Sequence, residues 1–384
     1  MANSLIVQKQ IGQANENLTR YANLGSGITF NGTEAQVETP IRDAGTFSNL
    51  FTYVSANNIT GNSTLTLRKS RADTTLTVTY SSNQTGIQED TSNSVAFVST
   101  DEADYASVTP LDDGASSITY QVIGSQFAPT TTTDCISFFR DNHGSGASFI
   151  TDSATGYFSP NGNIVSISTT EANVKYRIRI ATTSSDFFVY VIINGRTTDT
   201  TYATRKNGAD GSQSVTYTSG QTGAKEDTTN TDSLSAGDDY NYRLTTGTGT
   251  QDIGTTNVST SLITTSNIFH NLAASIGFGV GVGFNTTTYS AIGGRHQVNT
   301  TAANSEIYPR FTFTAKELGV YVSGNTIATS ATTVDIMDNG VASGITVSYA
   351  AAETGLKNDS SNTAEITSGT DEINCRIVTP NTSG

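Results

Sequence analysis

The stretch Val78-Thr79-Tyr80 is followed, six residues after its tyrosine, by Gly86, and four residues later by Asp90 of the segment Glu89-Asp90-Thr91-Ser92-Asn93. The same steps of six and four residues recur twice further along the chain. The second copy runs from Tyr217 through Gly223 to Asp227, and the third runs from Tyr349 through Gly355 to Asp359. Three copies at identical spacing exclude chance and identify an internal repeat.

Each copy has the length of a whole domain. Runs that alternate apolar and polar residues, such as Leu65-Thr66-Leu67, predict strands with one buried and one exposed face. Each copy holds seven or eight such strands over roughly 130 residues, which is too long for a solenoid rung and suits a sandwich of two sheets. We therefore predict an all-β protein of three tandem β-sandwich domains with a jelly-roll-like topology, at residues 1–128, 129–269 and 270–384.

The composition favours a folded β-protein and excludes several classes of function. Charged residues make up only 14% of the chain, but 16 Tyr and 16 Phe accompany many short Val/Ile runs, which argues against disorder. The net charge of −14 offers no basic patch for a nucleic-acid backbone. No window approaches the roughly 18 apolar residues of a membrane span. We expect neither nucleic acid nor membrane among the partners.

The hairpin turns are repeated as well. Asn207-Gly208 and Asn339-Gly340 lie between β-rich runs, which is the strongest short signal for a type I′ turn. The first copy has Ser70-Arg71 at this place, so we expect a turn of another type or length there. The residues that define the repeat are therefore the two Asn-Gly pairs together with Gly86, Asp90, Gly223, Asp227, Gly355 and Asp359.

A closing strand follows the shared pattern in the first two copies, at residues 117–128 and 258–265, but the third copy has none. The N-terminal residues 4–14 resemble that strand, with Leu5, Ile6, Val7 and Ile11 as its apolar side chains. A sandwich that lacks a strand exposes unpaired backbone groups and is completed by a matching donor. Residues 1–14 are thus a candidate donor strand, either within the chain or between chains. The alternative is a frayed tail beside a third domain that ends one strand short.

No arrangement of residues indicates catalysis. None of the three histidines has the spacing of a metal ligand, and the two cysteines are about 240 residues apart, too far for a metal-binding pair close in sequence. Glu89-Asp90 recurs as Glu226-Asp227, but Asn358 replaces the first acid in the third copy. This drift favours side chains that fix a loop by hydrogen bonds over a pair of catalytic carboxylates. We predict no enzyme and no cofactor, with a weak Ca²⁺ site in these loops as the alternative.

The residues around the repeat carry a resemblance. In the first copy these are residues 43–50 and 64–69 with the Gly86 and Asp90 segment, and in the second copy they include Arg205-Lys206-Asn207-Gly208 and Ala236-Gly237-Asp238. The pattern resembles a β-sandwich repeat of tailed-phage and prophage structural proteins and spans nearly the whole chain. The third copy departs most, with Asp338 and Thr370 where the second has Lys206 and Asp238.

The resemblance implies a component of the virion surface, assembled in the host cytoplasm, and no catalysis. Its partners would be copies of itself and a major capsid or other virion protein. We expect a capsid decoration protein. The alternatives are an extracellular filament polymerised by exchange of the N-terminal strand, and a fibre module that binds host glycans, which the absence of Trp disfavours.

Overall fold

The computed structural model describes residues 4–9, 13–25, 30–130, 134–140, 153–160, 162–163, 167–249, 252–264, 282–292 and 298–380. The predicted all-β class is confirmed: the described residues form sheets in which all pairs but the short parallel one at residues 139–140 and 162–163 are antiparallel. They also form three short 3-10 turns, η1 (Glu34–Gln36), η2 (Glu171–Val174) and η3 (Ala302–Ser305). No described helix is long and apolar enough to cross a membrane. The chain divides into two compact units, residues 1–275 with 293–295 and residues 276–292 with 296–384.

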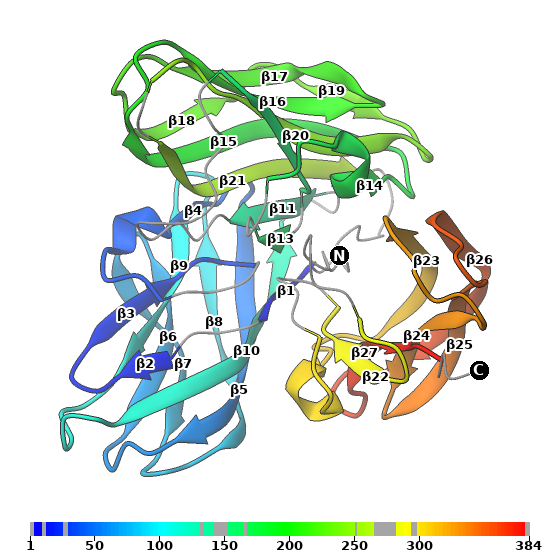
Figure 1. The fold of residues 1–384 in the computed structure, drawn as a ribbon. Helices are drawn as coiled ribbons and strands as arrows, with labels where there is room; N and C mark the ends of the chain where they lie inside the picture. The colour runs from blue at the N-terminus through cyan, green and yellow to red at the C-terminus, as the bar shows by residue number, and fades with distance from the viewer. Residues whose placement is uncertain are drawn as a thin grey trace. The chain divides into compact units, whose positions relative to one another are not determined.

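The first sandwich consists of two sheets whose order follows a simple rule (Figure 1). Counted along the chain, its eight main strands are ordered 1-8-3-6 in one sheet and 2-7-4-5 in the other. This is the order of a jelly roll. The first sheet is β1 (Ser4–Lys9), β10 (Ser117–Pro129), β5 (Gly45–Asn57) and β8 (Gly86–Phe97). The second is β3 (Thr19–Ala22), β9 (Glu102–Val108), β6 (Ser63–Lys69) and β7 (Ala72–Tyr80), and the short strands β2 (Gln13–Asn15) and β4 (Thr39–Pro40) pair with β10 and β9.

The second sandwich repeats this order. Its first sheet is β11 (Asp134–Arg140), β21 (Ile253–Thr264), β15 (Thr182–Asn194) and β18 (Gly223–Asp227). Its second sheet is β12 (Thr155–Phe158), β20 (Asp239–Thr245), β16 (Thr200–Lys206) and β17 (Ala209–Tyr217). Three short strands, β13 (Gly162–Asn163), β14 (Tyr176–Arg177) and β19 (Asp232–Leu234), extend these sheets. Both sandwiches lie in the first compact unit.

The third sandwich, in the second unit, keeps one full sheet and part of the other. The full sheet is β22 (Thr287–Ser290), β27 (Ile373–Val378), β24 (Thr332–Asp338) and β25 (Val341–Tyr349). The other holds only β23 (Phe313–Val322) and β26 (Gly355–Ile366). Among the described residues, no strand lies on the edge of β23 where β10 and β21 pair with β5 and β15. Accordingly, no side chain of β23 is fully buried, whereas β5 and β15 are mostly buried along their middle.

The N-terminal strand has a place in the first sandwich. β1 pairs antiparallel with β10, from Ser4 opposite Phe127 to Lys9 opposite Val122. β11 holds the equivalent position beside β21, so β1 is the first strand of its own jelly roll. Leu5, Ile6 and Val7 lie on β1, and Ile11 lies outside the described residues. Deleting residues 1–14 should therefore destabilise the first sandwich, and exchange of this strand between chains stays a prediction.

The cores of the first two sandwiches form where the inward faces of the two sheets meet. The closing strands contribute to both: β10 supplies Ile118, Tyr120, Ile123 and Phe127, and β21 supplies Ile253, Val258 and Leu262. Burying a large apolar side chain stabilises a fold by about 1.5–3 kcal/mol. The described part of the third sandwich lacks this contribution.

Candidate functional site: the repeated polar residues

The repeated tyrosine and glycine are partners in one contact. The buried hydroxyl of Tyr80 lies 3.0 Å from the carbonyl oxygens of Thr52 and Gly86, so it ties β7 to the other sheet. Gly86 has φ +91°, a conformation that glycine adopts without strain. Tyr217 with Gly223 and Tyr349 with Gly355 repeat the contact at 2.9 and 3.0 Å. The six-residue step is therefore the length of chain needed to bring this carbonyl under the hydroxyl.

The repeated aspartate holds a bulge in the edge strand. Asp90 Oδ1 accepts hydrogen bonds from the backbone N–H groups of Ser92 and Asn93 at 3.2 and 3.1 Å. Its Oδ2 accepts one from the N–H of Thr77 on β7 at 3.0 Å, and Asn93 Nδ2 donates to both oxygens. The bulge is visible in the register, where Ser48 pairs with Ser94 but Leu50 pairs with Asp90. One carboxylate thus joins the edge strands of the two sheets.

The same carboxylate geometry occurs in all three sandwiches. Asp227 accepts from the N–H groups of Thr229, Asn230 and Ser214 at 3.2, 3.1 and 3.1 Å. Asp359 accepts from those of Ser361, Asn362 and Thr346 at 3.2, 3.1 and 2.9 Å. The prediction that these side chains fix a loop by hydrogen bonds agrees with this geometry.

These contacts also set the charge state of the carboxylates. Burial alone would raise the pKa of Asp227, but the hydrogen bonds from Asn230, Ser214 and Thr229 outweigh it and lower the pKa to about 2. N–H groups that point at a carboxylate stabilise its charged form. A cation would have to compete with these donors, so the repeated loops are poor Ca²⁺ sites.

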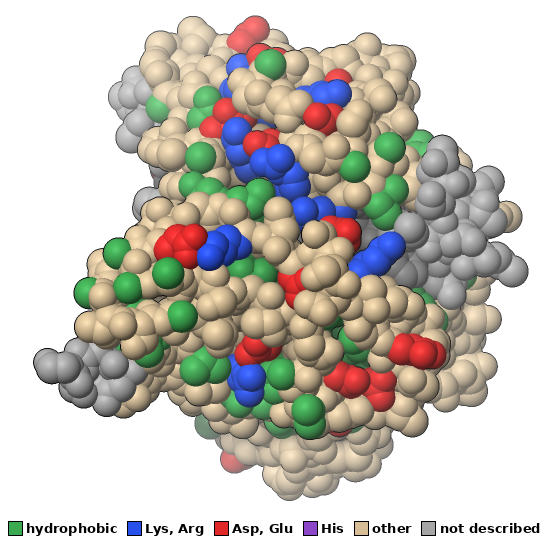
Figure 2. All heavy atoms as spheres, turned by 90° about the vertical axis from the view of Figure 1, so that its right-hand side faces the viewer, with side chains coloured by type: hydrophobic (Ala, Val, Ile, Leu, Met, Phe, Trp, Pro, Cys, Tyr) green, Lys and Arg blue, Asp and Glu red, His purple; other side chains and the backbone are tan. Residues whose placement is uncertain are grey.

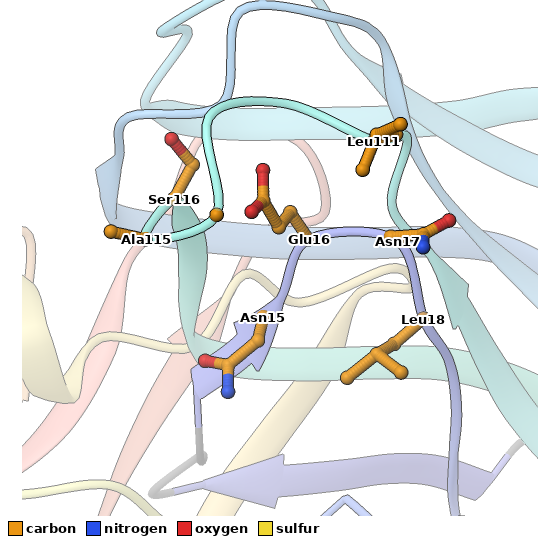
Figure 3. Close-up of a pocket in the computed structure, with 8 residues that line it drawn as sticks. Asn15, Glu16, Asn17, Leu18, Leu111, Ala115 and Ser116 are labelled. Atoms are coloured by element: carbon orange, nitrogen blue, oxygen red, sulfur yellow. The ribbon is translucent and has the colours of Figure 1, made fainter.

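Among the described residues, the three acidic residues that come close enough to one another to hold a metal ion lie elsewhere. Glu16, Asp112 and Asp113 place one carboxylate oxygen each within 4.8 Å of one another, beside a pocket in the first sandwich. Figure 3 shows the Glu16 side chain directed toward the loop that carries Leu111 and Ser116. Asp112 accepts from Thr60 N and Oγ1 at 2.7 and 2.5 Å, and Asp113 accepts from Ser116 Oγ at 3.0 Å. These bonds account for the two aspartates as loop contacts.

The hairpin turn of the first copy corrects the sequence prediction. Asn207 and Gly208 have φ +51° and +80°, as a type I′ turn requires, and Asn339 and Gly340 match them. Ser70 and Arg71 have φ +46° and +67°, so the first turn has the same left-handed conformation and the same two-residue length. The prediction of another type or length was wrong. Arg71 is held in this unfavourable conformation by Glu38, to which it donates at 2.9 and 2.8 Å.

This turn yields a reciprocal prediction. Asn207 Oδ1 accepts from Asp239 N at 2.8 Å, whereas Ser70 Oγ accepts from Glu102 N at 3.3 Å. Ser70→Asn should shorten that bond and suit the left-handed backbone, which would raise the free energy of unfolding of the first sandwich by about 1 kcal/mol. Asn207→Ser should lower that of the second by a similar amount. Thermal unfolding monitored by circular dichroism measures both. A less stable Ser70→Asn variant or a more stable Asn207→Ser variant would contradict the account.

The sequence reasoning missed a fourth repeated residue. Asn57 Nδ2 donates to the carbonyls of Ser81 and Gln84 at 3.4 and 3.0 Å, and its Oδ1 accepts from Ile59 N at 3.1 Å. Asn194 and Asn325 make the corresponding contacts. The printed sequence contains a signal for them, a Tyr-Val pair followed three residues later by Asn in every copy, at Tyr53, Tyr190 and Tyr321.

An ion pair is present in two copies and replaced in the third. Arg205 donates through Nε and Nη2 to the two carboxylate oxygens of Glu171 at 3.0 and 3.1 Å. Arg68 and Glu34 make the same pair at 2.8 and 3.2 Å. At the equivalent positions of the third copy stand Met337, which is buried, and Ala302. Losing both partners together leaves no unpaired charge.

The charged side chains on one face of the molecule are mixed in sign. On the face shown in Figure 2, Lys and Arg side chains lie beside Asp and Glu, and most of the surface is uncharged.

His143, His270 and His296 lie outside the described residues, and so does the side chain of Cys135. Cys375 on β27 is a free cysteine. In the described part of the chain, every repeated polar side chain discussed above bonds the protein's own backbone or an adjacent side chain.

Comparison with known proteins assigns no function to these residues. No family model matches the chain, and no curated protein matches it.

Proposed function

We propose that the chain is a non-enzymatic structural protein of a virion surface, of the capsid decoration type, that works by contacts with a shell and with copies of itself. The observation that carries the proposal is that one sandwich occurs three times, complete as a jelly roll in the first two copies. In each copy the repeated Tyr, Asp and Asn side chains form hydrogen bonds with backbone groups of the same sandwich, and the Tyr hydroxyl bonds the carbonyl of the repeated Gly. A catalytic or binding site would need side chains directed at a ligand, and a repeat of such a site would need the same chemistry three times.

Two further observations favour this class of function. Jelly rolls are common in viral capsid proteins, although a fold alone does not define a function. The resemblance of the repeat to phage structural proteins points the same way. Copies of the chain and a capsid protein are the proposed partners, and the virion surface is the proposed location.

The edge of β23, which no described strand covers, favours a second candidate, a filament subunit. An unpaired strand edge presents N–H and C=O groups that accept another strand. The half-buried side chains of β23 show that this edge also lacks an apolar cover among the described residues. A strand from another copy would supply both the backbone hydrogen bonds and the apolar cover. A heterologous contact of this kind generates rings or open fibres.

The test is the assembly state of the purified full-length chain, measured by native mass spectrometry and electron microscopy over a wide range of concentration. A structural role through β23 predicts oligomers that disappear in Val320→Lys, because a charge at this half-buried position would be buried without a partner when a strand is added. Thr314→Lys, at an exposed position of the same strand, should leave assembly unchanged and serves as the matched control.

The images separate the candidates. Discrete oligomers, or particles bound to isolated phage shells, support the decoration protein, and a thread of one protein supports the filament. A monomer at every concentration that also fails to bind shells would overturn both.

A further inference from the structure

A short segment of the first sandwich contacts the second through described residues. Asn257 Nδ2 on β21 donates to the backbone oxygen of Glu38 at 3.0 Å, and this contact is buried. Arg42 forms an ion pair with Glu226, and its guanidinium lies 5.7 Å from the centre of the Phe188 ring. Residues 38–42 surround β4, so β4 carries these described contacts between the first and second sandwiches.

β4 is held to its own sandwich by few bonds. Its two residues pair with β9 only, Thr39 opposite Ala103 and Pro40 opposite Glu102. The N–H of Ile41 donates to the carbonyl of Asp101 at 2.8 Å. Anything that disturbs β9 beneath β4 will therefore disturb the contact between the two sandwiches.

Buried acids lie at this place. The Glu38 side chain is 4% exposed and paired with Arg71, and the Glu102 carboxyl group forms a hydrogen bond with that of Glu38. Asp104, two residues further along β9, is fully buried, and neither of its oxygens has a hydrogen-bond partner. The other ionisable groups that act on Asp104 and Glu102 are Tyr21 on β3, Glu34 on η1, Arg42 after β4, Arg68 on β6 and Arg71 in the turn.

The other sandwiches keep only part of this arrangement. In the third, Glu306 and Glu372 stand at the places of Glu38 and Glu102, and burial and the charge of Glu372 raise the pKa of Glu306. Strand pairing places Asp104 opposite Arg68, Asn241 opposite Arg205 and Asn374 opposite Met337, so Asp104 is the counterpart of two asparagines. The second sandwich also has Lys175 paired with Asp239 at 3.3 Å, at the places of Glu38 and Glu102. In the second sandwich, the acids of the first are thus replaced by a neutral amide and an ion pair.

The protonation of these acids is coupled to folding. Burial raises the pKa of Asp104 to about 9, the charges of Glu34 and Glu38 act in the same direction, and Arg68 opposes them. Burial and the charge of Glu38 also raise the pKa of Glu102. A carboxyl group with a raised pKa binds its proton more tightly when buried, so the buried state is most stable below the ordinary pKa, near 4. Its stability falls as the pH rises toward about 9, because opening then releases the proton.

We propose that the contact between the first and second sandwiches is a pH-sensitive joint. β4 stays docked on β9 while Asp104 and Glu102 carry protons, and it loosens when they release them. Ionisation places negative charge beneath Glu38, and β4 moves away with the residues that touch the second sandwich. In the second sandwich Asn241 replaces Asp104 and Asp239 is paired with Lys175, so the equivalent strand β14 does not respond.

Hydrogen exchange measured by mass spectrometry on the full chain tests the joint. We compare wild type with Asp104→Asn, the residue that the other two copies carry, at about pH 4 and about pH 9. At the higher pH, the amides of residues 38–43 should exchange at least about tenfold faster in wild type than in the variant. At the lower pH the two proteins should exchange alike. Comparison at one pH cancels the intrinsic effect of pH on exchange.

Two controls separate titration from packing. Asp73→Asn changes an exposed acid beside Arg68 and should leave exchange at residues 38–43 as in wild type. Residues 175–179 of the second sandwich should be unaffected by Asp104→Asn at either pH. Equal exchange in wild type and Asp104→Asn at both pH values would overturn the proposal. So would an equal difference at both pH values, because that would show a packing effect.

Discussion

Asp227→Ala is expected to lower the free energy of unfolding of the second sandwich by about 3 kcal/mol or more, since hydrogen bonds to a charged group contribute about 1.5–3 kcal/mol each. The substitution leaves the N–H groups of Thr229, Asn230 and Ser214 without their acceptor at the edge of both sheets. Chemical denaturation of the full chain, followed by hydrogen exchange in the second sandwich, measures the loss. Thr228→Ala, at the exposed neighbouring residue, is the matched control and should change little.

The same substitution should change the acid sensitivity of the second sandwich. The pKa of Asp227 is lowered to about 2 in the folded state, so its contribution is complete above the ordinary value of 3.8. That contribution is lost as the pH falls toward about 2. Wild type should therefore lose stability over this range more steeply than Asp227→Ala. Parallel pH profiles for the two proteins would contradict the assigned role.

Arg205→Met should cost the second sandwich about 3 kcal/mol, because it leaves the half-buried carboxylate of Glu171 without its partner. The double variant Glu171→Ala, Arg205→Met should return to within about 1 kcal/mol of wild type, since removing both members of a buried pair is often neutral. The third copy, with Ala302 and Met337, is the natural form of this double variant. Equilibrium unfolding of the two single variants and the double variant gives the coupling energy.

The second sandwich is the correct host for this experiment. It already has Asn241 where the third copy has Asn374, whereas the first has the buried acid Asp104 beside Arg68. Asp210, the other partner of Arg205, is half exposed and keeps its ion pair with Arg243. A double variant as unstable as Arg205→Met alone would show that the pair is not interchangeable with its apolar replacement.

The fold class could be predicted from the sequence because the repeated residues form hydrogen bonds or turns with backbone that is close to them in the chain. The Asn-Gly turns and the Asp with its following Asn need only nearby backbone, so their spacing was sufficient evidence. The turn at Ser70 and Arg71 could not be predicted in the same way, because its conformation depends on Glu38, more than thirty residues away. The residues near this turn in the sequence do not reveal a partner that lies so far away in the chain.

Two other misses have equally physical causes. The similar segments Asp104-Tyr105 and Asp239-Tyr240 suggest that the two acids are equivalent, but this alignment is two residues out of register. The pairing with Arg68 and Arg205 shows that Asn241 is the counterpart of Asp104. Alternation has a period of two residues, so a shift of two keeps every side chain on its face and leaves no trace in the pattern. The third copy replaces both Glu171 and Arg205 of the second. This joint replacement can be interpreted as the loss of an ion pair only once the structure shows that the two residues are in contact.

The central claim is that one jelly roll occurs three times and that its repeated polar residues hold structure. The most direct measurement is hydrogen exchange across the whole chain in three variants, Asp90→Ala, Asp227→Ala and Asp359→Ala. The claim predicts the same pattern three times, with protection lost at β7 and β8, at β17 and β18, or at β25 and β26, and only in the sandwich that bears the change. One variant that leaves its own sandwich fully protected while its equivalents do not would contradict it.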